Sequence, residues 1–197
     1  MSKNIVDSPV GSELAVIHKD FEGGGGMDYA VCPEHATWAQ TGLLQLVNGA
    51  TKTIDLGIYG FAWGPICDAL IAAHNRGIKV RVVFDRTQAG GCGERDYVAE
   101  SVAAGIECYE GTSPEHQIRH TKNLVIDGLT GETGSLNYSV TGFGQNNLVE
   151  FFSDEAIAAS ITADLNDNIA WLIENEPQWN AAGGMKATPT PPVKEPT

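Results

Sequence analysis

The sequence predicts a single α/β domain, and three observations indicate this class. A strand, a helix and a second strand follow one another over residues 53–84, which is the pattern of a βαβ unit with two parallel strands. Further strand and helix patterns precede and follow this unit. The chain has 197 residues, of which 42% are hydrophobic, so it can form one packed core and is not disordered throughout.

Two strand patterns and a helix pattern precede the βαβ unit. Residues 14–17 predict a short strand, the glycines at 23–26 predict a flexible turn, and a second strand begins at Met27. Residues 34–48 predict a helix, because apolar residues recur at helical spacing, at Leu43, Leu44 and Val47. We therefore expect residues 1–26 to form an N-terminal segment and the main domain to begin at residue 27.

The βαβ unit is defined by its periodicity and by helix signals. Residues 53–59 predict a strand that has three apolar side chains on one face, those of Ile54, Leu56 and Ile58. Pro65 suits the first turn of the helix that follows, and Gly77 ends that helix. Residues 78–84 are almost continuously apolar and predict the second strand, interrupted only by Lys79 and Arg81.

The remaining elements alternate in the same way. A short helix is predicted over residues 96–104 and a short strand over 106–109, and later a strand over 148–152 and a long amphipathic helix over 154–173. From Ala181 onward, small residues and four prolines replace the apolar periodicity. We therefore expect residues 181–197 to form a disordered, proline-rich tail.

The charge of the chain limits its partners. Twelve Lys and Arg stand against 25 Asp and Glu, which gives a formal net charge of −13. Binding to the phosphate backbone of nucleic acids draws most of its affinity from basic side chains, so broad wrapping of a nucleic acid is disfavoured. A small local basic site is still compatible with this composition.

The N-terminal region and the cysteines suggest a cytoplasmic protein. Residues 1–20 contain no apolar run after their charges, and no stretch reaches the roughly 20 apolar residues that cross a bilayer. We therefore expect neither a secretory signal nor stable membrane insertion. The four cysteines are widely spaced and predict neither a metal site nor a disulfide, and we expect no cofactor; they are Cys32, Cys67, Cys92 and Cys108.

The segment over residues 120–137 carries the side chains that could take part in a chemical reaction. Residues 123–126 predict a strand, and extending it backwards brings His120 and Lys122 onto one face, because residues two apart share a face. Ser135 and Asn137 are also two apart and can share a face, whereas a regular strand points Asp127 away from His120. An imidazole, an ammonium, a hydroxyl and a carboxamide can therefore converge on one point.

This set of groups suits transfer of a phosphoryl group. Such a reaction needs a nucleophile in line with the leaving group and positive groups or donors on the non-bridging oxygens. His120 can act as the nucleophile, Lys122 can place a charge on the phosphate, and Ser135 and Asn137 can donate hydrogen bonds. A phosphohistidine intermediate would make the reaction a double displacement that requires no metal.

The spacing His120-x-Lys122-x4-Asp127-x6-Gly134-Ser135-x-Asn137 resembles the HxKx4Dx6GSxN signature of the phospholipase D superfamily at every fixed position. Over about residues 27–179 the chain is also similar to the short, single-motif branch typified by bacterial Nuc-type endonucleases. This resemblance implies a mixed central β-sheet flanked by helices and a phospholipase D-like catalytic domain over residues 27–180.

The resemblance also implies roles for single residues. His120 would be the nucleophile, Lys122 and Asn137 would bind phosphate, Ser135 would lie close to it, and Asp127 would orient or support the site. One position departs from the nuclease branch, which carries a carboxylate after the GSxN element to orient the histidine. Asn146 falls about where this acid is expected, and a carboxylate follows only four residues later, as Glu150.

A second acid is needed to protonate the leaving oxygen, and larger superfamily members take it from a second HxK motif. This chain has one such motif, so a two-fold homodimer would bring two copies of His120 face to face. One neutral and one protonated imidazole would give a bell-shaped pH profile. The alternatives within the chain are His116 and His35.

Three functions are compatible with the sequence. The first is a metal-independent endonuclease that acts on DNA or RNA as a homodimer. Arg119 and Lys122 are the cations nearest the motif, and Lys79, Arg81 and Arg86 could lie on the same sheet edge. The second is a phospholipase D-like hydrolase of phospholipids or small phosphodiesters, and the third a non-catalytic phosphate-binding module. Aromatic residues after the first strand of the βαβ unit could stack on bases, contact acyl chains or simply pack, namely Tyr59, Phe61 and Trp63.

Overall fold

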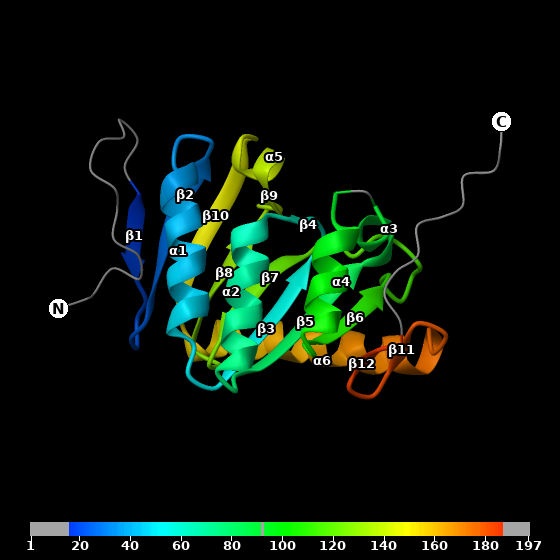
Figure 1. Ribbon diagram of the computed structural model, residues 1–197. Helices are drawn as coiled ribbons and strands as arrows, with labels where there is room; N and C mark the ends of the chain where they lie inside the picture. Colours follow the sequence, from blue (N-terminus) through cyan, green and yellow to red (C-terminus); the bar gives the residue numbers. More distant parts are fainter. Residues whose placement is uncertain (1–15, 92, 187–197) are drawn as a thin grey trace.

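The computed structural model describes residues 16–91 and 93–186. They form a central eight-stranded sheet with helices on both faces (Figure 1). Its strands lie in the order β1 (Ile17–Asp20), β2 (Gly26–Cys32), β10 (Asn147–Ser153), β8 (Thr130–Gly134), β7 (Lys122–Ile126), β3 (Thr53–Ile58), β5 (Lys79–Asp85) and β6 (Glu107–Gly111). The predicted α/β class with a mixed central sheet is confirmed.

Parallel and antiparallel strands occupy different halves of this sheet. Strands β3, β5 and β6 pair in parallel, as the βαβ pattern predicted. Strand β7 pairs antiparallel with β3 on the other side, and β8, β10, β2 and β1 continue as antiparallel neighbours. Strand β7, which carries Lys122, therefore lies between the two halves of the sheet.

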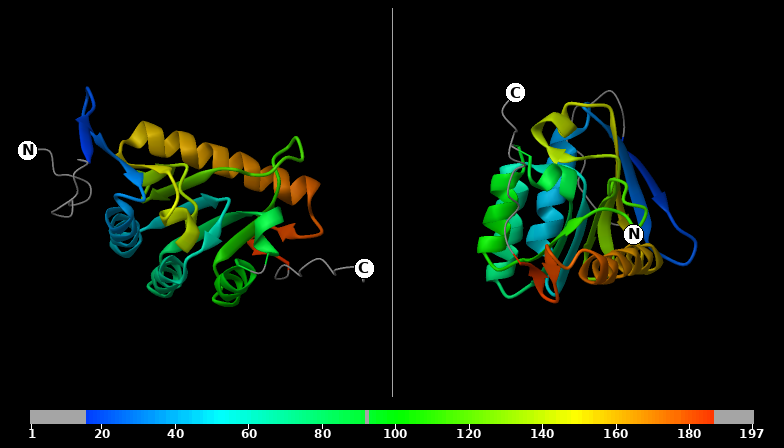
Figure 2. Two further views of the ribbon diagram at one scale, coloured as in Figure 1. Left: turned by 90° about the horizontal axis from the view of Figure 1, so that it is seen from above. Right: turned by 90° about the vertical axis from the view of Figure 1, so that its right-hand side faces the viewer.

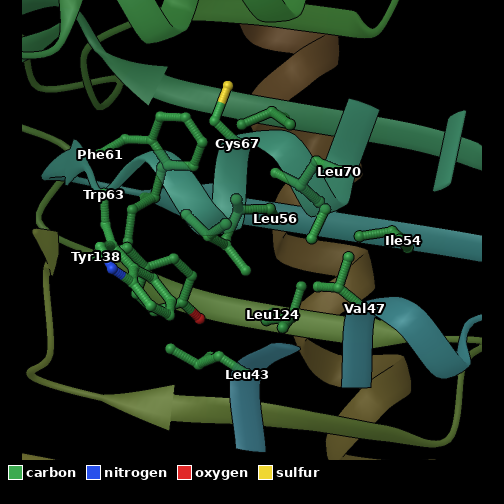
Figure 3. Close-up of a cluster of buried hydrophobic side chains, with 14 of the residues drawn as sticks. Leu43, Val47, Ile54, Leu56, Phe61, Trp63, Cys67, Leu70, Leu124 and Tyr138 are labelled. Atoms are coloured by element: carbon green, nitrogen blue, oxygen red, sulfur yellow. The ribbon is translucent and has the colours of Figure 1, made fainter. Parts of the chain in front are cut away.

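Three helices cover one face and one long helix covers the other, as Figure 2 shows from above. The first face carries α1 (Ala36–Gly49), α2 (Gly64–Asn75) and α4 (Arg95–Ala103), and the second carries α6 (Glu155–Asn175). The main core lies under the three helices, and Figure 3 shows Ile54 and Leu56 within it. Ile54, Leu56 and Ile58, which were predicted to share one face of their strand, are all fully buried. Smaller apolar clusters pack under α6, such as that of Val83, Leu165 and Leu172.

Several loops and short elements lie together at one edge of the sheet. We call it the C-terminal edge, because β3, β5 and β6 all end there. It also carries the short elements β4 (Phe61–Ala62), α3 (Arg86–Ala89), β9 (Tyr138–Ser139) and α5 (Val140–Phe143), at the top of Figure 1. In open α/β sheets the carboxyl ends of the parallel strands are where ligands bind.

The ends of the chain differ from the sequence prediction. The first described strand is β1 at Ile17–Asp20, where residues 14–17 were expected, and residues 1–15 lie outside the described part. The tail expected from residue 181 is wrong over its first part, because β11 (Asn180–Ala181) and β12 (Gly184–Met185) form a small hairpin. Asn180 fixes this hairpin to β6 through hydrogen bonds with both the N–H (3.0 Å) and the carbonyl (2.9 Å) of Glu110. Residues 187–197 lie outside the described part.

Candidate active site

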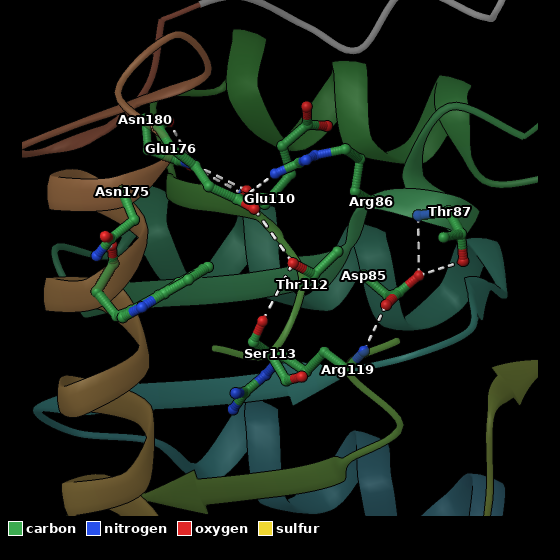
Figure 4. A network of polar contacts seen from close by, with 11 residues as sticks. Asp85, Arg86, Thr87, Glu110, Thr112, Ser113, Arg119, Asn175, Glu176 and Asn180 are labelled. Atoms are coloured by element: carbon green, nitrogen blue, oxygen red, sulfur yellow. Dashed lines mark hydrogen bonds and ion pairs between the residues drawn. The ribbon is translucent and has the colours of Figure 1, made fainter. Parts of the chain in front are cut away.

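The segment that carries His120 connects β6 with β7 and is held on both sides of the histidine. The backbone N–H of Arg119 donates to Oδ2 of Asp85 at 2.6 Å, and the backbone N–H of Tyr59 donates to the Thr121 carbonyl at 2.9 Å. Asp85 is fully buried at the end of β5, and Figure 4 shows it between Thr87 and Arg119. Two strand ends therefore fix the backbone around His120.

The imidazole of His120 lies against an aromatic ring, and a buried ammonium lies near the same ring. Its ring centroid is 4.7 Å from that of Tyr59, and Nζ of Lys122 is 4.9 Å from the centroid of the same tyrosine. Lys122 also donates to the His120 carbonyl at 2.8 Å, and Gln88 donates to the Tyr59 hydroxyl at 3.0 Å. His120 itself is exposed, so the cluster presents an accessible imidazole backed by a cation.

The environment of Lys122 lowers the pKa of its ammonium group. The side chain is only 2% exposed, and burial lowers the pKa of the Lys122 ammonium to about 8, against the attraction of Asp85. A bound phosphate would add negative charge beside the ammonium and favour its charged form. An anion that binds at His120 would therefore raise the pKa of Lys122 and keep its ammonium charged.

Asn137 reaches the same part of the edge through a glycine. A Cβ atom on Gly60 would lie 2.9 Å from Cγ of Asn137, so only glycine allows the carboxamide to pack against this backbone. Oδ1 of Asn137 is buried and has no hydrogen-bond partner among the described residues. Because Gly60 directly follows Tyr59, Asn137 lies beside the strand end whose tyrosine ring contacts His120 and Lys122.

Ser135 is tied to the neighbouring strand. Gly134 has a φ of +147°, and a Cβ there would collide with the Leu148 carbonyl, which accepts from the Ser135 N–H at 3.1 Å. The Ser135 hydroxyl accepts from the Leu148 N–H and donates to Asn147 Oδ1, both at 2.9 Å. The hydroxyl lies on the C-terminal edge, but these bonds give it a structural task there.

Asp127, which the resemblance implied to orient or support the site, does not lie at it. It follows the opposite end of β7, so the strand rise of about 3.3 Å per residue separates it from His120 by roughly 20 Å. Asp127 and Gly128 have φ values of 54° and 70° and form the tight β7–β8 turn, in which the Leu129 N–H donates to the Ile126 carbonyl.

The carboxylate of Asp127 anchors the loop between α1 and β3. Its oxygens accept four hydrogen bonds of 2.7 to 2.9 Å, from the backbone N–H groups of Thr51, Lys52 and Thr53 and from the Thr51 hydroxyl. Partial burial raises the pKa of Asp127, but these hydrogen bonds outweigh it and lower the pKa below its usual value. Asp127, the third fixed position of the motif, therefore supports the fold.

The two residues considered as supports for the His120 ring, Asn146 and Glu150, lie in different parts of the structure. Asn146 is exposed on the C-terminal edge and lines a pocket together with Ser135 and Asn147. Glu150 lies inside β10, paired with Tyr29 and Thr133, and burial raises its pKa. No described hydrogen bond connects either residue to His120, so neither is placed as its partner.

The two histidines considered as alternative acids, His116 and His35, have no described contact with His120. His116 is exposed in the loop before β7, and its ring lies 5.8 Å from that of Trp171. His35 is 2% exposed before α1, and its Nδ1 lies 3.1 Å from the Val31 carbonyl oxygen. A role for His35 as the acid that protonates a leaving group is therefore wrong, because a substrate cannot reach its buried ring.

The expectation that further cations lie on this edge is wrong for Lys79 and Arg81. Lys79 begins β5 and lies at the opposite end of the sheet, and Arg81 donates to Asp55 at 2.7 Å. Arg86 lies on the C-terminal edge but is paired with Glu176 (Figure 4). Its guanidinium also lies over the ring of Trp179, 3.6 Å from the ring centroid. Carboxylates thus neutralise most of the cations that the sequence offered for phosphate binding.

Two carboxylates at this edge were missed by sequence reasoning. Asp85 directly follows the apolar run of β5, a position that already marks the end of a buried parallel strand. Glu94 is 7% exposed before α4, and burial raises its pKa to about 7. Nothing in the sequence around Glu94 indicates burial, because the residues that cover it come from distant elements.

Comparisons with known proteins identify the class that this fold and this site define. The family model described as "Cardiolipin synthase, PLD-like domain" matches residues 43–169. The chain belongs to this family of phospholipase D-like domains. The resemblance seen in the motif is thereby confirmed.

Particular relatives share part of their length with this chain. A mitochondrial cardiolipin hydrolase of Xenopus laevis is 28% identical over 132 residues, which are 66% of this chain and 61% of the relative. A phospholipase D of Rickettsia prowazekii (strain Madrid E) is 30% identical over 106 residues, 53% of this chain and 49% of the relative. The chain thus spans less than two thirds of the length of these relatives.

Solved structures confirm the fold. Nuc of Salmonella typhimurium, a phospholipase D family member, has a TM-score of 0.66 at 23% identity, covering 73% of this chain and 93% of its own. NucT of Helicobacter pylori has a TM-score of 0.64 at 17% identity, covering 73% and 94%. Within residues 16–91 and 93–186, no helix is long and apolar enough to span a membrane.

The role of Asp127 can be tested by Asp127→Asn. The amide places an N–H₂ group where the loop donors need an oxygen, so we expect the free energy of unfolding to fall by about 2 kcal/mol at pH 7. Since the pKa is lowered in the folded state, the carboxylate stabilises the protein above pH ~4, and this contribution is lost as pH falls through the folded pKa. Urea unfolding at pH 7 and pH 3 measures both effects.

Thr51→Val is the matched control, because it removes one of the four hydrogen bonds and should cost about 1 kcal/mol. The folded Asp127→Asn variant should keep the cleavage rate of the wild type within a few-fold. A large loss of activity with unchanged stability would instead place Asp127 in the reaction.

Proposed function

We propose that the protein is a metal-independent phosphodiesterase that works through a phosphohistidine intermediate. The observation that carries this proposal is the cluster at the start of β7, where the exposed His120 lies on Tyr59 beside the buried ammonium of Lys122. An accessible imidazole can attack phosphorus, while the ammonium and the Asn137 carboxamide neutralise and hold the non-bridging oxygens.

The reaction has two balanced steps. In the first, a neutral nitrogen of His120 attacks phosphorus, a P–N bond forms, the P–O bond to the leaving group breaks, and a second, protonated imidazole gives its proton to the leaving oxygen. In the second, that imidazole takes a proton from water, the water oxygen attacks phosphorus, and the P–N bond breaks. A phosphate monoester and the original protonation states result.

The second imidazole is proposed to be His120 of the partner subunit in a two-fold homodimer. Within the described residues, His35 is buried, and the ring of His116 contacts Trp171 and has no described contact with His120, which favours the partner's His120 over both. The C-terminal edge also exposes Val140, which is 74% exposed and follows Asn137 by three residues. An apolar side chain at this place would be covered if two copies met across the site.

The proposed substrate is a short or single-stranded nucleic acid, which the protein would cut as an endonuclease. Few cations at the C-terminal edge lack a carboxylate partner, so contact with one or two phosphates is favoured over gripping a long duplex. A bilayer substrate would call for an apolar or basic docking surface. The large apolar side chains exposed in the described part are scattered, at Ile17, Ile118, Leu129 and Val140.

Phospholipids or small phosphodiesters are the second candidate, supported by the names of the relatives, which include a cardiolipin hydrolase and a phospholipase D. A non-catalytic phosphate-binding module is the third. The same residues would bind phosphate in all three cases, so substrate trials must separate them.

The chemistry is tested by incubating the protein in EDTA with single- and double-stranded DNA and RNA and with a panel of phospholipids. We expect cleavage of single strands without added metal. His120→Ala should lower the rate by about 10⁴-fold or more, because a nucleophile is lost. Cleavage by His120→Ala at the rate of the wild type would contradict the mechanism, and turnover of lipid alone would assign the second candidate.

The dimer is tested by Val140→Asp, which places a charge in the proposed interface. We expect light scattering to show a monomer and cleavage to fall at least 100-fold. Leu129→Asp is the matched control, because Leu129 is 43% exposed at the opposite end of β7, and it should leave both properties unchanged. A monomeric Val140→Asp variant with full activity would overturn the shared site.

A further inference from the structure

A pocket of about 450 Å³ lies directly beside His120, on the face of the sheet that α6 covers. One wall is the segment before β7, with Pro114, Ile118 and Arg119, and the other wall is a single face of α6. That face repeats at helical spacing and consists of Asp164, Asp167, Asn168 and Trp171. The phosphodiester chemistry proposed above uses none of these residues of α6.

The wall opposite α6 is ordered by its own hydrogen bonds. The His116 N–H donates to the Ser113 carbonyl at 2.8 Å, and the Ser113 N–H donates to the Gln117 carbonyl at 2.9 Å. The ring of His116 then lies 5.8 Å from that of Trp171. The pocket therefore has a preformed shape, with a flat aromatic side chain and apolar neighbours on its walls.

The polar groups of the pocket include both hydrogen-bond donors and hydrogen-bond acceptors. Arg119 is 7% exposed and donates to Asp164 at 3.2 Å, and its Nε is buried without a hydrogen-bond partner among the described residues. Asn168 is 6% exposed, and its Oδ1 likewise has no described partner. Asp167 is exposed and has no described ion pair or hydrogen bond. The pocket thus contains the carboxylate of Asp167 as an acceptor and the guanidinium of Arg119, which is hydrogen-bonded to Asp164 through one nitrogen and has no described partner at Nε.

Resting on the proposed nuclease function, we propose that this pocket binds the base next to the scissile phosphate and prefers bases with an exocyclic amino group. Trp171 gives the ring a stacking surface, and Asp167 can only accept, so it suits the amino group of cytosine, adenine or guanine. Thymine presents an N–H flanked by two carbonyl oxygens, which the carboxylates repel.

The charges in the pocket set which groups it can bind. Arg119 neutralises Asp164, so among the charged residues of the lining Asp167 keeps an uncompensated carboxylate, and the vesicle test below separates a base from a cationic headgroup at this position. A neutral base has donors for Asp167 and acceptors for Arg119 on the same ring. The carboxylates also keep the phosphate out, which leaves it at His120 and Lys122.

The test uses His120→Ala, which binds without cutting, and labelled single-stranded octamers of dC and of dT. Fluorescence anisotropy should show about tenfold tighter binding of oligo-dC. Adding Asp167→Asn should bring this ratio close to one, because an amide both donates and accepts. Adding Glu174→Gln, on the same helix outside the pocket, should leave the ratio unchanged. Trp171→Leu should weaken both octamers about tenfold.

The outcomes separate this inference from the proposed function. Equal binding of both octamers, or a ratio that Asp167→Asn does not change, would overturn the base pocket even if the wild type cleaves nucleic acid. Discrimination in binding without any cleavage by the wild type would support the pocket and overturn the nuclease. Binding to vesicles of phosphatidylethanolamine that Asp167→Asn abolishes would assign the pocket to a cationic headgroup and overturn the inference.

Discussion

The hydrogen bond from the Arg119 N–H to the buried Asp85 carboxylate is the contact on which the site depends. It connects the end of a parallel strand with the segment that enters β7, directly beside His120. Oδ1 of Asp85 is meanwhile bound by the N–H and the hydroxyl of Thr87. A buried carboxylate that is satisfied on both oxygens can hold a loop in one position, and a nucleophile needs that fixed position to align with phosphorus.

The same constraint explains how an acidic protein can handle a phosphate. Lys122 is buried behind His120 and is close enough to Asp85 to be attracted by it, so a single cation is concentrated where the phosphate would bind. Elsewhere on the C-terminal edge, Arg86 and Arg119 are held by Glu176 and Asp164. The net charge of −13 thus limits how many phosphates of a polyanion the protein can bind at once. It does not prevent a reaction at a single phosphate.

Local patterns in the sequence predicted most of the fold and the centre of the site. Alternation identified β3, Pro65 identified the start of α2, and the spacing of two identified the pair His120 and Lys122. These features depend on neighbours along the chain. The task of Asp127 was misjudged because its loop partners lie more than 70 positions away, and the pairing of Arg86 was missed because Glu176 belongs to the C-terminal part. The hairpin at β11–β12 was missed because Asn180 stabilises it through contacts with β6.

The central claim is that His120 becomes covalently bound to phosphorus, and the stereochemistry at phosphorus tests it most directly. A substrate with a chiral phosphorothioate at the scissile position is cleaved in isotopically labelled water, and the configuration of the product is determined. Two successive in-line displacements predict retention of configuration. Inversion would show a single displacement by water and would contradict the account.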